Sequence, residues 1–246
     1  MKFGGSSVEG LEALRKVVAL VGDCAGANDV VVVASAMNGV TNSLIEAATH
    51  ASRRDDSYVA QLTGQVRAKH ENVCKQVIAG QDEFKQIMGS LDLELRELER
   101  ALTGISYLGE LTSRSRDYVL SFGERLSTLV LAGALHDSGL AVQRLTGGEA
   151  GIVTDASFGE ATPLIDVTQQ KLKEKLCPLI RDRQIPVITG YIAATENGIP
   201  TTLGRGGSDY TATIIGSALG ADEVWIWTDV DGIMTADPKI EPTAQT

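Results

Sequence analysis

The apolar positions of this chain switch between two periodicities, and the switching predicts helices that alternate with buried strands. Residues 29–35 (DVVVVAS) form a continuous β-branched run, which is typical of a strand covered on both faces in a parallel sheet. Before that run, apolar residues recur at helical spacing, at Leu11, Leu14, Val17, Val18 and Val21. The stretch Ser6-Ser7-Val8-Glu9 fits a capping box at the start of this helix.

The same alternation continues along the rest of the chain. Short apolar runs predict further strands at residues 2–3, 142–145, 185–190 (extended by Tyr191 and Ile192) and 223–227. Helical spacing predicts helices at residues 41–51, 118–135 (interrupted near Phe122-Gly123), 164–181 and 208–219, the last capped by Gly220. Turns are expected at Gly147-Gly148 and, as a hairpin, at residues 196–198 (ENG).

Residues 53–105 differ from this pattern. They are rich in Glu, Lys, Arg, Gln and Leu and carry no strand signal, so we expect two or three helices that form a lobe. Strands alternating with helices elsewhere indicate layered α/β architecture. The sequence therefore predicts a three-layer α/β/α sandwich with a mostly parallel central sheet and a helical insertion around residues 53–105.

Polar and glycine-rich turns follow several of the predicted strands. They come after Phe3, after Ile188 and after Trp227, and residues 35–41 follow the β-branched run. Ligands of open parallel sheets bind beyond the carboxyl ends of the strands. We therefore expect these distant segments to meet at one edge of the sheet and to form the site there.

Composition narrows the classes of function. The chain has 246 residues and a net charge of −10, which argues against a general nucleic-acid binder. No apolar segment approaches a membrane span and no signal peptide is evident, so we expect a cytoplasmic protein without a membrane partner. The 3 cysteines and 3 histidines lack metal-ligand spacing, and no protein metal site is predicted.

The segment 202–212 (TLGRGGSDYTA) carries the strongest chemical signal. Its glycines allow backbone N–H groups to approach an anion, and the predicted helix that follows offers more such groups. Arg205 adds a planar cation suited to a carboxylate or a phosphate. A Walker phosphate loop is absent, since no glycine is followed directly by lysine. The GxGxxG motif is incomplete, because Asp209 stands where its last glycine would be.

Five segments together resemble the aspartate kinases of the amino-acid kinase superfamily. They occur in the family's order and are residues 2–7 (KFGGSS), 34–42 (ASAMNGVTN), 121–128 (SFGERLST), 202–211 (TLGRGGSDYT) and 227–238 (WTDVDGIMTADP). The archaeal members look most similar, judging by residues 105–125. The resemblance implies transfer of the γ-phosphoryl group of MgATP to the side-chain carboxylate of L-aspartate, as the first step toward lysine, threonine and methionine.

This chemistry agrees with the residue types. The side chain of aspartate has a pKa near ~4, so at neutral pH it is already an anionic nucleophile that needs no general base. The protein must bring two anions together and neutralise charge on the transferred group. Lysine, Mg²⁺ and backbone N–H groups can do so.

The resemblance also implies which residues form the site. The expected catalytic residues are Lys2, at the transferring phosphate, and Asp209, which would orient Lys2 or the metal-bound phosphates. The expected aspartate-binding residues are Ser35, Thr41, Glu124 (for the α-ammonium), Arg205 (for the α-carboxylate), Gly206 and Ser208. The expected ATP-binding residues are Lys2, Phe3, Gly4, Gly5, Ser6, Thr228, Asp229, Met234 and Lys239.

Several of these residues also have a purely structural explanation. Ser6 and Thr41 fit helix caps, Ser121 and Glu124 fit a second capping box, and Asp209 complements a helix N-terminus. Met234 and Lys239 stand where many family members carry tyrosine and arginine, and the lysine lacks the bidentate fork of arginine.

Rival functions remain open from sequence. Aspartate kinases usually continue with more kinase domain and with ACT domains, so the resemblance implies that residues 1–246 are a catalytic domain without that C-terminal part. One rival is another kinase of the superfamily that acts on glutamate, acetylglutamate or UMP. A second is a truncated regulatory subunit that binds nucleotide or aspartate without turnover. A homodimer through the kinase lobe is also open.

Overall fold

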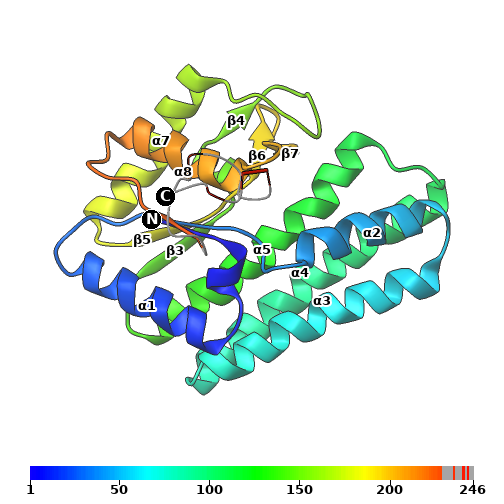
Figure 1. Cartoon of the computed structure of the whole chain (residues 1–246), viewed down its shortest axis with the longest axis horizontal. Helices are drawn as coiled ribbons and strands as arrows, with labels where there is room; N and C mark the ends of the chain where they lie inside the picture. Colours follow the sequence, from blue (N-terminus) through cyan, green and yellow to red (C-terminus); the bar gives the residue numbers. More distant parts are fainter. Residues whose placement is uncertain (229–234, 236–239, 242, 244–246) are drawn as a thin grey trace.

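A five-stranded parallel sheet forms the centre of the protein (Figure 1). The computed structural model describes residues 1–228, 235, 240, 241 and 243. The strands lie in the order β3-β5-β2-β1-β8, and their bounds are β1 Lys2–Phe3, β2 Val32–Ala34, β3 Val142–Leu145, β5 Ile185–Thr189 and β8 Ile226–Trp227. Because every pairing is parallel, the carboxyl ends of all these strands lie at one edge.

The two faces of the sheet belong to different apolar clusters. Val32 and Ala34 of β2 pack into the larger cluster, whereas Val33, between them, packs with Ile188 of β5 into the second cluster. Successive side chains of a strand point to opposite faces, so the β-branched run serves both cores. The sequence prediction of a strand buried on both faces is confirmed, although β2 is shorter than the predicted run.

Helices cover both faces and complete the predicted three layers. Helices α7 (Ile165–Arg181) and α8 (Gly207–Leu219) pack on one face. Helices α1 (Leu11–Ala25) and α5 (Ser113–Asp137) lie on the other, as Figure 1 shows. The three-layer α/β/α prediction is confirmed.

The expected helical lobe is present and packs on α5. It comprises α2 (Val40–Ser52), α3 (Asp56–Val77) and α4 (Gln81–Leu108), seen at the right of Figure 1. A stripe at helical spacing on α4 is fully buried in this lobe, and its members are Leu91, Leu95, Leu98 and Leu102. The lobe therefore shares one continuous core with the sheet.

A second, three-stranded sheet lies beyond the carboxyl edge of β5. It contains β4 (Val153–Thr154), β6 (Ile192–Thr195) and β7 (Pro200–Thr202), with β6 and β7 antiparallel. The predicted hairpin turn is confirmed. The predicted extension of β5 through Tyr191 and Ile192 is wrong, because Tyr191 has φ +65° and breaks the strand before β6 begins.

Three further local predictions need correction. The residues of the proposed capping box at Ser6 lie in a 3-10 turn (Gly5–Val8), and α1 begins later, after Gly10. Gly147-Gly148 opens a short helix, α6 (Gly147–Ala150), whose N-cap is Thr146. The last strand, β8, covers only residues 226 and 227 of the predicted 223–227.

Helix α5 runs without interruption through Phe122 and Gly123. Its N-cap is Thr112, which forms a capping box with Ser115, so the proposed box at Ser121 and Glu124 is wrong. Gly123 serves a close approach instead of a break: a Cβ built there would lie 2.9 Å from the Cβ of Ala36. The missing side chain allows α5 to touch the segment that follows β2.

No helix in the described part of the chain is both long and apolar enough to cross a membrane.

We predict that Gly123→Ala destabilises the protein by about 1–3 kcal/mol, because the added methyl group must displace Ala36. Gly104→Ala is the matched control. Gly104 also lies inside a helix, but a Cβ there meets nothing within 4 Å, so this change should stabilise by roughly 0.5–1 kcal/mol. Urea unfolding of both variants measures the difference. Equal effects of the same sign would refute the close-approach explanation.

Candidate active site

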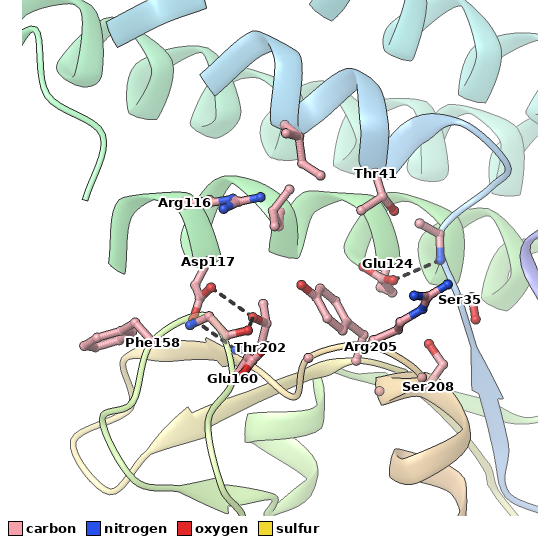
Figure 2. A pocket seen from close by; sticks show the side chains of 18 of the residues that line it. Ser35, Thr41, Arg116, Asp117, Glu124, Phe158, Glu160, Thr202, Arg205 and Ser208 are labelled. Carbon is pink, nitrogen blue, oxygen red and sulfur yellow. Dashed lines mark hydrogen bonds between the residues drawn. The ribbon is translucent and has the colours of Figure 1, made fainter. Parts of the chain in front are cut away.

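A cavity of about 1160 Å³ opens at the carboxyl edge of the central sheet. It lies between α5, the segment after β2, the N-terminus of α8 and a loop at residues 156–160. Figure 2 shows side chains from these separate elements directed into the same space. The predicted site residues that line it are Lys2, Ser35, Thr41, Glu124, Arg205, Gly206, Ser208 and Asp209. Of the four segments expected at this edge, those after β2 and after β5 line the cavity, whereas the described residues that follow Phe3 and Trp227 do not.

The other predicted residues lie elsewhere. Phe3, Gly4, Gly5, Ser6 and Thr228 do not line the cavity. The side chain of Phe3 is buried in the core and stacks with Trp227, with ring centroids 6.3 Å apart. Gly4 lies beside the amino group of Lys2, since a Cβ there would be 3.7 Å from Nζ. Asp229, Met234 and Lys239 lie outside the described residues.

Lys2 reaches the cavity from the middle of the sheet. Its side chain is almost fully buried, and Nζ lies 2.7 Å from the Oδ1 atom of Asp209 in the first turn of α8. Asp209 is half exposed, at 52% of its side-chain area. A buried ammonium with one carboxylate partner keeps further N–H donors for an anion in the cavity. The placement matches the predicted role of Asp209 in orienting Lys2, and both roles remain predictions.

Glu124 is one of two almost fully buried acids that line the cavity, with 4% of its area exposed. It lies in the middle of α5, on the turn that Gly123 brings against Ala36. Its Oε1 atom accepts a hydrogen bond of 3.2 Å from the N–H of Ala36. Its Oε2 atom has no hydrogen-bond partner among the described residues. The site thus contains a buried acceptor whose second oxygen lacks a hydrogen-bond partner among the described residues.

Burial dominates the electrostatics of this carboxyl group. Loss of hydration raises the pKa of Glu124 to about 8, although the N–H of Ala36 acts in the opposite direction. A cation bound at Oε2 would lower this pKa again, because it favours the charged form. The cavity therefore favours a ligand that brings its own positive charge to Glu124.

Arg205 and Ser208 stand at the start of α8, and Figure 2 shows the side chain of Arg205 directed from there toward Glu124. The N-cap of this helix is Gly206, with φ +75°, and it makes no side-chain cap. The N–H groups of Gly207 and Asp209 donate to the carbonyl oxygens of Gly204 and Gly206, so this terminus contributes mainly the positive end of the helix dipole. An exposed guanidinium beside this terminus makes a receptor for a carboxylate or a phosphate.

Ser35 and Thr41 enter from the opposite wall. Ser35 directly follows β2, and Thr41 lies in the first turn of α2. The N-cap of α2 is Gly39, so Thr41 is not the cap that its sequence position suggested. Its hydroxyl faces the cavity in Figure 2 and is a candidate ligand contact.

The cavity has lining residues that the sequence did not single out. Among them are Arg116, Asp117, Phe158, Glu160 and Tyr191. Tyr191 directly follows the predicted strand at residues 185–190, and this position at a strand end was a signal that it could line the site. Asp117 lies inside a helix, and no sequence feature indicated that it lines the site. Tyr191 keeps φ +65°, which for a bulky residue costs roughly 1–3 kcal/mol and is typical of functional sites.

Among the residues that the structure describes, no group of three or more His, Cys, Asp or Glu side chains could hold an ion. Mg²⁺ commonly keeps water and phosphate oxygens with only one or two carboxylates. Asp209, half exposed in the cavity, is the carboxylate placed to supply such a contact.

Comparison with known proteins shows which protein family the chain resembles. The family model of the amino acid kinase family matches residues 1–246. Aspartokinase 2, chloroplastic, of Arabidopsis thaliana is 36% identical across 100% of this chain and 44% of its own length. Aspartokinase 1, chloroplastic, of the same plant is 37% identical across 98% of this chain and 41% of its length.

Solved structures agree with these relatives. Aspartokinase III of E. coli in complex with aspartate and ADP superposes with a TM-score of 0.89, at 28% identity, over 99% of this chain and 52% of that chain. The same enzyme with lysine and aspartate gives a TM-score of 0.86 at 28% identity. The chain spans about half the length, or less, of the relatives that it matches.

We predict that Glu124→Gln stabilises the ligand-free protein in alkaline solution. The pKa of this carboxyl is 4.5 in its unperturbed state and about 8 in the folded protein. Between these values the folded state holds a proton that the unfolded chain has lost, so stability falls as pH rises through this window. The variant removes that fall, so its stability relative to the parent should increase by about 3–4 kcal/mol between pH 5 and pH 8.

Thermal unfolding at the two pH values measures this effect. Glu196→Gln, in an exposed turn, is the control and should show no such pH dependence. A difference between Glu124→Gln and the parent that is the same at pH 5 and pH 8 would contradict the account.

Proposed function

The chain belongs to the amino acid kinase family, and on that premise we propose that it transfers the γ-phosphoryl group of MgATP to the side-chain carboxylate of L-aspartate. The products are 4-phospho-L-aspartate and ADP. The observation that carries this proposal is the buried Glu124 carboxyl with one unpartnered oxygen, which lines the same cavity as the Arg205 guanidinium. These two groups match the α-ammonium and the α-carboxylate of a free amino acid.

Glu124 recognises the ammonium group. An α-ammonium at Oε2 would supply the missing hydrogen bond and the charge that burial otherwise penalises. Binding would convert the protonated carboxyl into a paired carboxylate, so recognition and deprotonation occur together. A ligand without an ammonium group leaves Glu124 unsatisfied.

Arg205 recognises the α-carboxylate. The guanidinium can form two parallel hydrogen bonds to it, and the Ser208 hydroxyl and the positive end of the α8 dipole add further attraction. Ser35 and Thr41, on the opposite wall, supply hydroxyl groups to the rest of the amino acid. The substrate is thus held at both ends of its backbone, which fixes the direction of its side chain.

Lys2 faces the reacting groups. The side chain of aspartate is ionised at neutral pH, so the attack on the γ-phosphorus requires no base. The obstacle is repulsion between the carboxylate and the triphosphate, and the buried Lys2 ammonium, oriented by Asp209, neutralises charge that develops on the transferred oxygens. Mg²⁺, when bound with ATP, supplies further charge neutralisation.

The turn after β1 is the expected seat of the phosphates. A Cβ on Gly5 would lie 2.6 Å from the carbonyl oxygen of Ala36, so this turn and the segment after β2 are in backbone contact. Gly4 leaves the space beside Lys2 Nζ open. The assignment of Phe3, Gly4, Gly5, Ser6 and Thr228 to ATP remains a prediction, as does a homodimer.

Other members of the superfamily fit the cavity less well. Acetylglutamate has no α-ammonium to pair with Glu124, and UMP has no α-carboxylate for Arg205. L-Glutamate carries both groups and is longer by one methylene, a difference that typically changes transition-state binding by only ~1–3 kcal/mol. Discrimination against glutamate therefore depends on the placement of Lys2 relative to Arg205.

The test is ADP release from MgATP with L-aspartate, L-glutamate, N-acetylglutamate or UMP as the acceptor. We expect the highest turnover with L-aspartate, with a hydroxamate-trappable acyl phosphate as product. Saturable binding of aspartate and ADP without turnover would favour a binding subunit. Turnover confined to another acceptor would overturn the proposal.

We predict opposite kinetic defects for the two cationic residues. Arg205→Ala should raise the KM for aspartate about 100-fold and change the KM for ATP little, since a charge-assisted bidentate contact is lost. Lys2→Ala should instead lower kcat by about 100-fold or more with a modest effect on aspartate binding. Steady-state kinetics with each substrate varied in turn separates the two. Equal damage to both KM values by Arg205→Ala would remove it from the aspartate site.

A further inference from the structure

We propose that Asp117 is a positioning residue that fixes the distance between Arg205 and Glu124. This inference rests on the proposed function, because it concerns how the two ends of the amino acid are held. Asp117 lies near the N-terminus of α5, lines the cavity and is 1% exposed. It is not one of the residues that the sequence pattern predicted.

The carboxylate of Asp117 binds two separate segments of the opposite wall. Its Oδ2 atom accepts hydrogen bonds from the N–H of Gly159, at 2.9 Å, and from the N–H of Thr202, at 3.2 Å. Its Oδ1 atom accepts one from the hydroxyl of Thr202, at 2.9 Å. Figure 2 shows the contacts between Asp117 and Thr202 at the end of the cavity away from Glu124. Both oxygens are therefore engaged before any ligand binds.

The two segments that Asp117 holds lead directly to Arg205. Thr202 ends β7, and only Leu203 and Gly204 separate it from the guanidinium-bearing residue. Gly159 precedes Glu160, whose side chain packs against Gly204: a Cβ on that glycine would lie 3.5 Å from the Cγ of Glu160. One carboxylate thus restrains the Arg205 loop both through β7 and through the neighbouring loop.

Helix α5 turns this restraint into a fixed separation. Asp117 and Glu124 are seven residues apart, which is close to two helical turns, so both lie on the same face about 10 Å apart along the axis. Glu124 is held at one point of this face by Ala36. At a second point of the same face, Asp117 binds Gly159 and Thr202 in the wall that carries Arg205. A rigid helix therefore spaces the ammonium receptor from the carboxylate receptor.

A carboxylate suits this position better than an amide. Three donors converge on Asp117, and a carboxylate accepts all three, whereas asparagine would accept only the two N–H groups and would donate to the Thr202 hydroxyl, which must then turn its proton elsewhere. Burial raises the pKa of Asp117, while these hydrogen bonds and the charge of Arg116 lower it. The convergence of donors keeps a costly buried acceptor satisfied.

The test is Asp117→Asn, alone and combined with Arg205→Ala. Alone, it should raise the KM and the Kd for aspartate about tenfold or more, with kcat and the KM for ATP within about threefold of the parent. In the Arg205→Ala background the same change should raise the Kd for aspartate less than twofold, because there is no guanidinium left to position.

Asp137→Asn is the matched control. Asp137 ends the same helix and also accepts two backbone N–H groups, from Ala79 and Gly80, but it lies outside the cavity. It should lower the melting temperature without changing the KM for aspartate. A KM for aspartate that Asp117→Asn leaves unchanged, or an effect that persists in full without Arg205, would overturn the inference.

Two further arms keep the result interpretable. If Asp117→Asn does not fold, Thr202→Val removes only the hydroxyl donor to Asp117 and must show the same dependence on Arg205, and no dependence would overturn the inference. The parent protein is assayed in parallel. Failure of the parent to bind or phosphorylate aspartate would contradict the proposed function, whereas an active parent with an unaffected Asp117→Asn variant would refute only the role of Asp117.

Discussion

The burial of the Glu124 carboxyl with only one hydrogen-bond partner is the constraint on which the rest of the site depends. Burying a carboxyl group with an unpartnered oxygen costs free energy. A ligand that brings an ammonium group to that oxygen removes this cost, so the site selects for such ligands. The protein can hold the group there because α5 passes through the core of the molecule and is packed on both sides, by the sheet and by the helical lobe. Stability is therefore given up locally to pre-form a binding site.

Helix α5 connects the fold with the proposed chemistry. Gly123 lets it touch the segment after β2, Glu124 faces the cavity, and Asp117 binds the wall that carries Arg205. On its other side, Arg125 and Arg144 pair with Glu94 of α4, at 2.5 and 2.8 Å, and this tie fixes the helical lobe to both α5 and β3. The lobe thus acts as a buttress for the helix, while the parallel sheet delivers Lys2 and the loops to the same edge. Recognition of the amino acid and placement of the phosphoryl group come from two different layers of one fold.

Sequence patterns revealed those features whose causes are local. The β-branched run before Ser35, the leucine periodicity of α4 and the glycines around Arg205 each show themselves within a few residues. The capping boxes at Ser6 and Ser121 were wrong, because a cap requires a helix end and neighbouring residues do not show whether the helix continues. Asp117 was missed because its partners, Gly159 and Thr202, are 42 and 85 residues away. Tyr191 was placed in a strand because only the tertiary setting forces its positive φ.

Proton release on binding of L-aspartate tests the central claim most directly. The pKa of Glu124 is about 8 in the free protein, so at pH 7 this carboxyl is mostly protonated. Calorimetric titration in buffers with different ionisation enthalpies measures the number of protons released. If an α-ammonium binds the carboxylate of Glu124, about one proton should leave for each aspartate bound, and Glu124→Gln should release none. Binding without proton release, or the same release from Glu124→Gln, would contradict the account.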